Sequence, residues 1–450
     1  MKRCLIVIFS LCALCAAATV RVTYDELQNG GWERYRGQYV QITTPLIVCG
    51  TFYDSLYLAP ERLYVPEERA KGLADGDSTE YYRIADYNHS VRIKCQCPYP
   101  YSLNLGATVK NLKAQITGER SLQTGSRPTF RNFKPSKRLP SLGEADLVVC
   151  ASNIQNYFVH LGGYATRRNT DGQHALQCYK VASALVKIDA DIYALCELEK
   201  GNSAPQELTQ KMNELCKKDK YDFVRTNTGD GDTISVGFIY NKLTVAPRGI
   251  ARQAYPDTTI YCSRFALQTF CQVSSGKQFV ISLNHLRSKR GTQEESLRKR
   301  MYNVNAILQN IADAYADSTI TDPDILMVGD FNTYAQEKPM QTLVRNNFED
   351  ALVRFDSTAY TYSYKGECGA LDRVYASPTM LNQITAIVPV HWNTDYYYSA
   401  AYYSKYNYKN RMIPKDKPED IRKYLSRAAK KNLIFRYSDH DPVLIGLRLK

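Results

Sequence analysis

Beyond its first 18 residues, this 450-residue sequence has no apolar run long enough to cross a bilayer, since a spanning helix needs about 20 apolar residues. It also lacks internal repeats and low-complexity tracts, which excludes repeat and fibrous classes. Histidine is scarce, with six residues. Cys95 and Cys97 are too close together for an ordinary structural zinc pair. What remains is a globular protein, and its length favours two domains.

The first 18 residues have the pattern of a signal peptide. Lys2 and Arg3 precede an apolar run that ends in the small residues Ala16, Ala17 and Ala18, where signal peptidase can cut. A membrane anchor is the alternative, but the run is shorter than the roughly 20 residues that an anchor needs. We therefore expect cleavage near Ala18, export to a secreted or periplasmic destination, and no stable membrane insertion afterwards.

Charge and cysteine content agree with such a destination. The formal net charge is +13, which favours polyanionic partners, although an excess of charge also occurs on merely solvated surfaces. Ten cysteines follow the leader. An even number in an oxidising compartment permits disulfides, but the spacing fixes no connectivity.

The sequence divides into three parts after the leader. Residues 19–118 contain short apolar strands broken by turns and predict a small all-β domain, whose size suits an OB-like, partly open barrel. Residues 119–144 are basic and rich in proline and predict a linker, which could also lie along a nucleic-acid backbone. Residues 145–450 alternate strands with helices and predict the α/β class.

Two helices can be located in this last part by the spacing of their apolar residues. Cys178, Val181, Leu185 and Ile188 have helical spacing. A second helix should begin at Thr292, with Glu295 three residues later as in a capping box. Its predicted apolar stripe consists of Leu297, Met301, Val304, Leu308, Ile311 and Tyr315.

Polar residues stand where several buried strands of this part end. Ile325–Val328 is one such strand, and Gly329 after it allows a sharp turn that leaves Asp330 and Asn332 at the strand's end. A carboxylate and an amide there suit phosphate-ester hydrolysis, because one can orient water while the other binds without adding charge. The residues in such positions are Asn153, Glu197, His285, Asp330, Asn332, Asp372, Asp439 and His440.

Each of these residues alone could have an ordinary structural role instead, such as a strand cap, a surface carboxylate or a core histidine. Together they indicate one site, since two of the six histidines lie beside carboxylates or amides at strand ends.

The motifs around them resemble the endonuclease/exonuclease/phosphatase superfamily, and most of all its secreted, deoxyribonuclease-like bacterial nucleases. The resemblance covers residues 146–450. The six motifs are 151–158, 189–199, 284–289, 329–332, 371–372 and 438–443. The resemblance implies a four-layer α/β sandwich, with two packed sheets, outer helices and a site at one edge. Two neighbours depart from the family pattern, Ser152 and Arg373.

The resemblance also implies roles. Glu197 would be the principal Mg²⁺ ligand, with Asn153 and Asp439 near the same metal or a second one; Ca²⁺ and Mn²⁺ are alternative ions. The catalytic residues would be His285, Asp330, Asn332, Asp372 and His440. Asp330 would activate water that Asn332 positions, and Asp372 would orient His440. Both histidines would contact the scissile phosphate.

The surroundings of the site favour nucleic acid as the substrate. Residues 405–436 hold eleven basic and three acidic residues, beginning beside several tyrosines, and such a mixture can follow phosphates and stack on bases. The alternative is a solvated surface flap whose tyrosines reflect the 35 tyrosines of the whole chain. The predicted substrate-binding residues are Arg287, Lys289, Arg422, Arg427 and Lys430. The sequence therefore predicts an exported, metal-dependent nuclease. The alternatives are a phosphodiesterase or phosphatase for a lipid or small phosphoester, and a non-catalytic nucleic-acid-binding protein.

Overall fold

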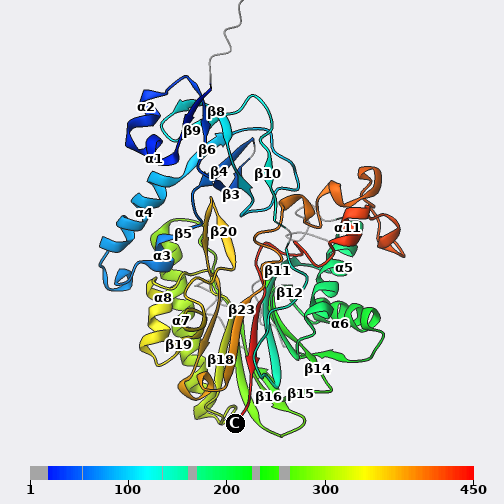
Figure 1. The fold of residues 1–450 in the computed structure, drawn as a ribbon. Coiled ribbons are helices and arrows are strands. Elements are labelled where there is room, and N and C mark those ends of the chain that lie inside the picture. Colours follow the sequence, from blue (N-terminus) through cyan, green and yellow to red (C-terminus); the bar gives the residue numbers. More distant parts are fainter. Residues whose placement is uncertain (1–18, 53, 134, 161–169, 226–233, 253–263) are drawn as a thin grey trace, which may run out of the picture.

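The computed structural model describes residues 19–450 apart from 53, 134, 161–169, 226–233 and 253–263. The expected signal peptide thus lies outside the described residues. Figure 1 shows a large α/β region with a smaller region above it that carries the N-terminal residues. None of the described helices is long and apolar enough to cross a membrane. The nine cysteines in the described residues are all free, so no disulfide joins any of them.

The large region is built on two six-stranded sheets. In spatial order the first contains β13 (Tyr221–Phe223), β14 (Ile234–Asn241), β12 (Ile192–Glu199), β11 (Leu147–Tyr157), β24 (Val443–Leu447) and β23 (Ile384–Pro389). The second contains β15 (Val245–Arg252), β16 (Arg264–Gln272), β17 (Gln278–His285), β18 (Ile325–Asp330), β22 (Asp372–Ala376) and β19 (Glu349–Asp350).

The sheets pack face to face, with helices on their outer faces. The side chains of β11 alternate between the two faces of the sheet. Val149 and Ala151 lie in the core between the sheets, whereas Cys150 and Ile154 lie in the core between the first sheet and its helices. The first sheet is covered by α5 (Asp171–Ile188) and α6 (Ser203–Cys216), and the second by α7 (Gln293–Ala316) and α8 (Lys338–Arg345). Shorter helices are α9 (Ala351–Phe355) and α10 (Pro378–Leu381). The mixed α/β class is as the sequence predicts.

Helix α7 begins where it was predicted, and its buried face overlaps the predicted stripe at Val304 and Ile311. Thr292 caps it by accepting a hydrogen bond from the Glu295 N–H at 3.3 Å. The buried side includes Val304 and Ile307, and also Arg300, whose guanidinium pairs with Glu337. The members of the predicted stripe that stay partly or largely exposed are Leu297, Met301, Leu308 and Tyr315. The buried face is rotated from the predicted stripe because it also contains polar side chains such as Arg300, which apolar periodicity cannot anticipate.

The small region is not all-β. Its nine-stranded sheet has the order β1 (Val20–Val22), β2 (Tyr39–Ile42), β8 (Leu112–Gly118), β9 (Ser121–Gln123), β6 (Ile93–Gln96), β4 (Ser55–Ala59), β3 (Leu46–Phe52), β7 (Thr108–Val109) and β10 (Phe130–Arg131). The helical elements are α1 (Tyr24–Glu26), η1 (Leu27–Gly31), α2 (Trp32–Arg34), α3 (Pro66–Arg69), η2 (Leu73–Asp75) and α4 (Thr79–Val91). Helix α4 shows no apolar period because only Asn88 and Val91 are buried in it. An OB-like barrel is not confirmed.

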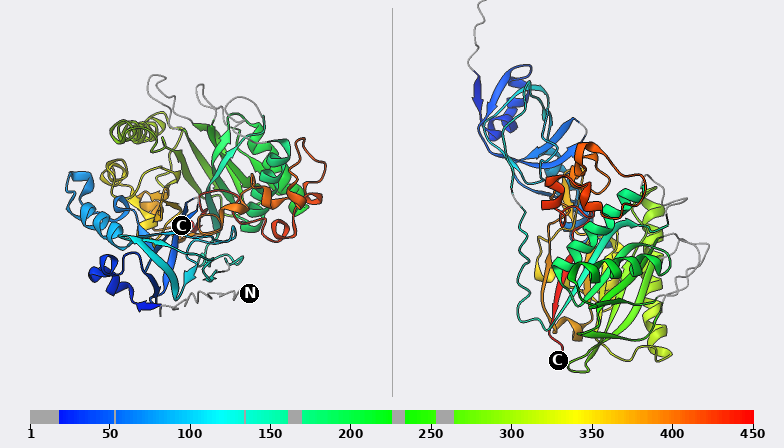
Figure 2. Two further views of the ribbon diagram at one scale, coloured as in Figure 1. Left: turned by 90° about the horizontal axis from the view of Figure 1, so that it is seen from above. Right: turned by 90° about the vertical axis from the view of Figure 1, so that its right-hand side faces the viewer.

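Two strands of this sheet, β9 and β10, fall within residues 119–144, which the sequence assigns to a linker. Beyond β10 the chain descends as an extended segment along the large region (Figure 2). The domain boundaries themselves stay a prediction.

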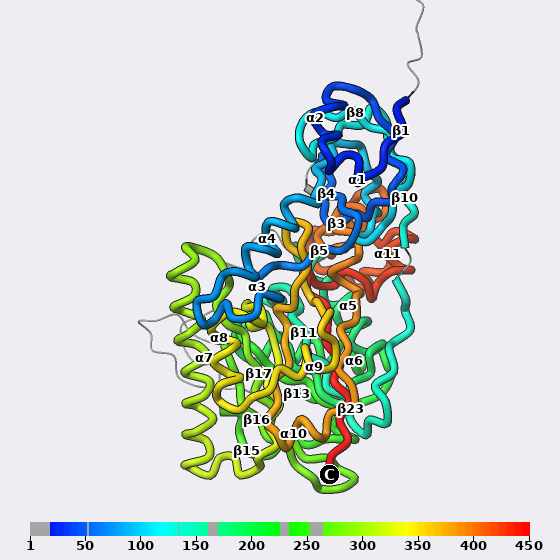
Figure 3. Tube along the Cα trace, turned by 60° about the vertical axis from the view of Figure 1, so that its left-hand side comes forward, coloured from blue at the N-terminus to red at the C-terminus, as the bar shows by residue number. Residues whose placement is uncertain are grey.

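The two regions share a small sheet. Its strands are β20 (Tyr362–Tyr364), β21 (Glu367–Gly369) and β5 (Leu63–Tyr64). β5 belongs to the small region and pairs in parallel with β21. Figure 3 shows α3 lying beside α8, where the Gln336 N–H donates to the Glu67 carbonyl at 3.0 Å. The N-terminal part of the chain is therefore built into the large region along several elements.

The basic segment 405–436 packs on helix α5. It contains η4 (Lys405–Asn407), η5 (Lys409–Arg411), η6 (Ile421–Lys423) and α11 (Arg427–Lys431), and η3 (Tyr398–Ala400) precedes it. Leu176 of α5 shares a buried cluster with Tyr408 and Leu425. One face of the segment is thus anchored, while its charged residues remain at the surface.

Candidate active site

The first half of the site lies at bulges in two neighbouring parallel strands. β11 and β12 pair in register up to Asn153 and Cys196, and the register shifts just beyond. The pairing of β12 with β14 shifts between Cys196 and Leu198. Glu197, between these two, has a φ of 67°, which a residue other than glycine keeps only where its surroundings impose it. Bulges of this kind re-aim side chains, and here they bring Glu197 to Asn153.

The second half lies on β17 and β18. These strands pair in parallel, so that His285 lies beside Asp330. Gly329 has a φ of 126°, and a Cβ there would meet the Asn284 carbonyl oxygen at 2.0 Å. Glycine alone fits this close approach. β18 therefore continues through Gly329 to Asp330 instead of ending at the glycine, and Asp330 pairs in turn with Asp372 of β22.

Asn153 joins the two halves. Its Nδ2 donates to Glu197 Oε1 and to Asp330 Oδ2, both at 3.0 Å. Asn332 holds Asp330 from the other side, since its backbone N–H donates to Oδ1 at 2.9 Å and its Nδ2 to Oδ2 at 3.2 Å. Two uncharged amides therefore keep two carboxylates close together without adding negative charge.

A divalent cation fits this arrangement. Glu197, His285 and Asp330 each offer a ligand atom, and these atoms all lie within 4.8 Å of one another. Burial raises the pKa of Glu197, and the charge of Asp439 raises it further. A cation would relieve this crowding of desolvated carboxylates, and carboxylate oxygens are what Mg²⁺ prefers.

The structure groups the predicted metal ligands only in part. Glu197 is in the cluster of three, whereas Asp439 is not a member of it. The Asn153 Oδ1, the atom that could bind a metal, accepts a hydrogen bond from the Gln155 N–H at 2.9 Å. The Asn153 Nδ2 holds the two carboxylates. The roles of Asn153 and Asp439 as ligands stay predictions.

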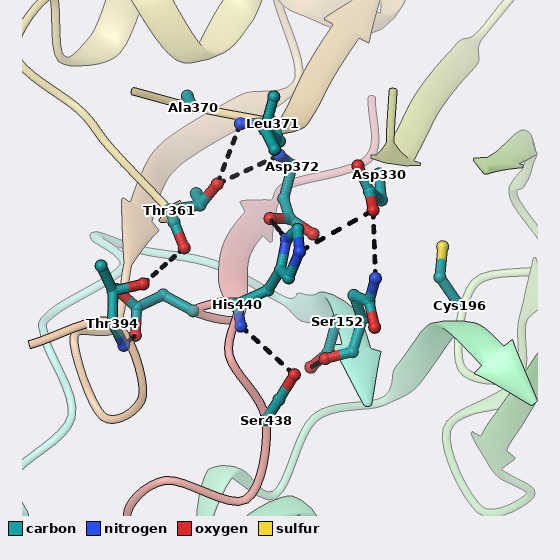
Figure 4. Close-up of polar contacts among 12 residues, drawn as sticks. Ser152, Cys196, Asp330, Thr361, Ala370, Leu371, Asp372, Thr394, Ser438 and His440 are labelled. Atoms are coloured by element: carbon teal, nitrogen blue, oxygen red, sulfur yellow. Dashed lines mark hydrogen bonds and ion pairs between the residues drawn. The ribbon is translucent and has the colours of Figure 1, made fainter. Parts of the chain in front are cut away.

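The His440 imidazole lies between two carboxylates (Figure 4). Its Nδ1 is 2.8 Å from Asp372 Oδ2, and its Nε2 is 4.0 Å from Asp330 Oδ2. Asp372 is itself fixed, because its N–H donates to Thr361 Oγ1 at 3.0 Å. The Tyr362 ring covers the imidazole at a centroid distance of 4.7 Å. His440 therefore has one ring nitrogen anchored and the other turned toward Asp330.

Electrostatics give these groups complementary proton affinities. Burial by itself lowers the pKa of His440, but the charges of Asp372 and Asp330 outweigh it and hold that pKa well above its usual value. Burial raises the pKa of Asp330 to about 7, although the charge of His440 opposes the rise. Near neutral pH the site thus combines a cationic imidazole with a carboxylate that can take up a proton.

His285 has the opposite character. Burial, followed by the charges of Arg264 and His440, holds its pKa well below the usual range. Its Nε2 lies 3.7 Å from Asp330 Oδ2, and Arg264 Nη1 lies 3.1 Å from its Nδ1. Sequence reasoning missed Arg264, which only the pairing of β16 with β17 places opposite His285.

The five predicted substrate-binding residues do not gather at one place. Lys289 pairs with Glu337 at 2.6 Å and lies over the Tyr334 ring, and Arg287 is half-buried after β17. Arg422 pairs with Asp420 at 2.8 Å on η6. The exposed residues Arg427 and Lys430 lie on α11. Their roles stay predictions.

Both departures from the family pattern have partners in this structure. Ser152 Oγ lies 3.0 Å from the Tyr437 hydroxyl. Arg373 is fully buried and pairs with Glu68 at 3.0 Å and with Asp350. Because Glu68 belongs to the small region, Arg373 ties that region to the strand that carries Asp372.

A protein-family model described as "Endonuclease/Exonuclease/phosphatase family" matches residues 164–449. Among solved structures, an endonuclease/exonuclease/phosphatase from Bacteroides vulgatus is similar at 15% identity, over 68% of this chain and 99% of that chain, with a TM-score of 0.44. The human Nocturnin catalytic domain with bound sulfate is similar at 14% identity, over 68% of this chain and 94% of that chain, with a TM-score of 0.42. Truncated Caenorhabditis elegans TDP2 is similar at 14% identity, over 68% of this chain and 99% of that chain, with a TM-score of 0.40. No curated protein matches the sequence.

Proposed function

Because this chain belongs to the endonuclease/exonuclease/phosphatase family, we propose that it is a metal-dependent nuclease that hydrolyses phosphodiester bonds of DNA or RNA. One observation carries the chemistry: Asp330 lies within 4.0 Å of the His440 Nε2 while Asn153 holds it beside Glu197. A proton acceptor, a cation and a metal-capable carboxylate thus meet at one point. We also propose, from the signal-peptide pattern of residues 1–18, that the protein is exported and acts outside the cell.

The residues divide the work of hydrolysis among them. Glu197 would hold a divalent cation, which supplies positive charge that stabilises a phosphoryl oxygen. Asp330 takes the proton of the attacking water as the water oxygen bonds to phosphorus and the bond to the leaving oxygen breaks. The leaving oxygen takes up a proton from solvent, so that the products are a phosphomonoester and an alcohol. Asn332 orients Asp330 through its two hydrogen bonds.

His440 stabilises the negative charge that develops on the phosphoryl group. Asp372 keeps the imidazole cationic and fixes its orientation, so that Nε2–H is free to donate. His285, with its lowered pKa, can contact the phosphate as a neutral donor.

A digestion panel tests the proposal. Supercoiled plasmid, linear DNA, RNA, bis(p-nitrophenyl) phosphate, the monoester p-nitrophenyl phosphate and a lipid phosphodiester (sphingomyelin) are incubated with the protein and Mg²⁺, with EDTA, and with EDTA followed by excess Mg²⁺. We expect cleavage of DNA or RNA that EDTA stops and Mg²⁺ restores. Hydrolysis of phosphomonoesters or lipid phosphodiesters alone would indicate the related phosphatase or phosphodiesterase instead. Binding of nucleic acid without any hydrolysis would indicate a non-catalytic protein.

A further inference from the structure

A cleft of about 940 Å³ is lined by residues of both regions and extends to Tyr362 and Asp439, which lie next to the candidate active site. One wall comes from the small region, including Tyr99 and Tyr101, and the other from the β20–β21 hairpin and residues 394–406. Asp439, the neighbour of His440, also lines the cleft, as does Gln155. In Figure 1 the N-terminal sheet, the β20 hairpin and the orange segment that precedes α11 meet at this place.

Hydrogen bonds across the cleft hold its walls in position. The Tyr397 N–H donates to Asn104 Oδ1 at 3.0 Å, and Ser399 Oγ donates to the Tyr101 carbonyl at 2.6 Å. Arg62 of the small region pairs with the buried Asp395 through two hydrogen bonds of 2.9 and 3.1 Å. The cleft is therefore a formed site with fixed walls, of the size that ligand sites have.

Aromatic side chains dominate this lining. Ten tyrosines contribute to it, and three of them have more than half of their surface exposed: Tyr101 at 67%, Tyr398 at 61% and Tyr364 at 57%. One face of Tyr101 stacks on Tyr406 at a centroid distance of 4.7 Å, so its other face is the one that a base could use. The series continues inward to Tyr362, whose ring covers His440. A flat ligand stacked on these rings would thus lead to the catalytic histidine.

The charged residues of the lining are almost all cationic. They are Lys365, Lys405 and Arg436, against the single carboxylate Asp439 at the catalytic end. Lys365 Nζ lies 5.2 Å from the Tyr364 ring centre, and the Arg436 guanidinium lies 5.8 Å from that of Tyr398. Cations beside exposed tyrosine rings match a strand of phosphates and unpaired bases. In duplexes the base faces already stack on one another and cannot lie on tyrosines.

We propose that this cleft binds single-stranded nucleic acid, with bases stacked on Tyr101, Tyr364 and Tyr398 and phosphates near Lys365, Lys405 and Arg436. The small region is then one wall of the substrate site. This inference rests on the proposed nuclease function and adds a preference for unpaired strands.

Binding to the full-length Asp330→Asn protein in EDTA tests the inference without turnover. Fluorescence anisotropy compares a labelled single-stranded 12-mer, the matching duplex, and an abasic 12-mer that keeps the phosphates and lacks bases. We expect the single strand to bind at least ~10-fold more tightly than the other two. Tyr101→Ala and Tyr398→Ala should each weaken single-strand binding by about 5- to 100-fold, while leaving abasic binding within about twofold.

The matched control is Tyr82→Ala, whose ring is equally exposed at 61% but lies on α4 outside the cleft; it should bind all three ligands as its parent does. Equal affinity for single strand, duplex and abasic strand would overturn the inference. So would equal losses of single-strand binding from Tyr82→Ala and Tyr398→Ala. The digestion panel reads hydrolysis separately, so failure of the nuclease function and failure of the cleft assignment give different results.

Discussion

Glu68 and Arg373 form a fully buried ion pair at 3.0 Å that joins the small region to the strand of the active site. Asp350 completes the pair on the opposite side of the guanidinium. Arg373 follows Asp372 in the chain, so the residue that orients His440 is one step from an ion pair that the small region supplies. The small region thus supports the strand that carries Asp372, and its residues also line the cleft.

Breaking this ion pair should destabilise the whole protein. Glu68→Gln leaves a buried guanidinium with less charge compensation, and breaking a buried pair costs about 3 to 5 kcal/mol. Urea unfolding of the variant should show this decrease. Glu33→Gln is the control, since its pair with Arg36 is exposed and should contribute under about 1 kcal/mol. A Glu68→Gln protein as stable as the control would contradict the assigned role.

The three central site residues should be needed for turnover but not for folding. Glu197→Ala, Asp330→Ala and His440→Ala should each lower kcat on DNA or RNA by at least ~10²-fold. Because burial raises the pKa values of Glu197 and Asp330, their charged forms cost folding free energy, and we expect the melting temperatures of these two variants to match or exceed that of the wild type. Any of the three variants that folds and keeps a near-wild-type rate would remove that residue from the mechanism.

Asp372 and His440 should behave as one unit in kinetics. Asp372→Asn removes the charge that raises the pKa of His440, so the decline of kcat at high pH should begin at a lower pH than in the wild type. Asp372→Asn combined with His440→Ala should be no slower than His440→Ala alone. Multiplicative losses in the double variant, measured on the same substrate, would mean that the two residues act independently.

Glu207 gives a pH-dependent contribution to stability. It accepts hydrogen bonds from His174 at 2.7 Å and from Lys417 at 2.9 Å. Burial works to raise its pKa, but these partners outweigh burial and lower the pKa to about 2. A carboxyl whose folded pKa is lowered stabilises the fold above its unfolded pKa of about 4.3, and this stabilisation is lost as pH falls toward 2.

Glu207→Gln should therefore be less stable than the wild type by about 1 to 3 kcal/mol at pH 7. The difference should narrow steadily in urea titrations between pH 5 and pH 3. A difference that stays constant with pH would mean that the ion pairs of Glu207 contribute nothing.

The basic segment 405–436 should be visible in salt dependence if it binds the phosphate backbone. In the Asp330→Asn background, neutralising Arg422, Arg427 and Lys430 should weaken binding of long nucleic acid. The slope of log K against log salt should flatten by roughly 0.7 to 0.9 for each side chain that no longer neutralises a phosphate. Unchanged slopes over a salt series would identify these residues as solvated surface, which their positions outside the cleft also permit.

Several candidate site residues could be located from the sequence because their signals are local. Asp330 can be recognised because it follows an apolar strand and a glycine. The other predicted positions also lie at the ends of apolar strands. What the sequence could not show depends on pairing between distant segments. Arg264 meets His285 only through β-sheet register, and Glu68 meets Arg373 across 305 positions. The cleft is likewise formed by residues from both regions that are far apart in the sequence, so no single segment predicts it.

The pairing of β5 with β21 also sets an order of events during synthesis. Long-range pairings of this kind cost loop-closure entropy before they gain interaction energy and so form late. β5 emerges from the ribosome roughly 15 to 60 s before β21 at ordinary elongation rates. Through that interval its edge has no partner from β21, and such an edge is a site for mispairing between nascent chains. A chaperone that covers residues 63–64 during translation would therefore raise the yield of folded protein.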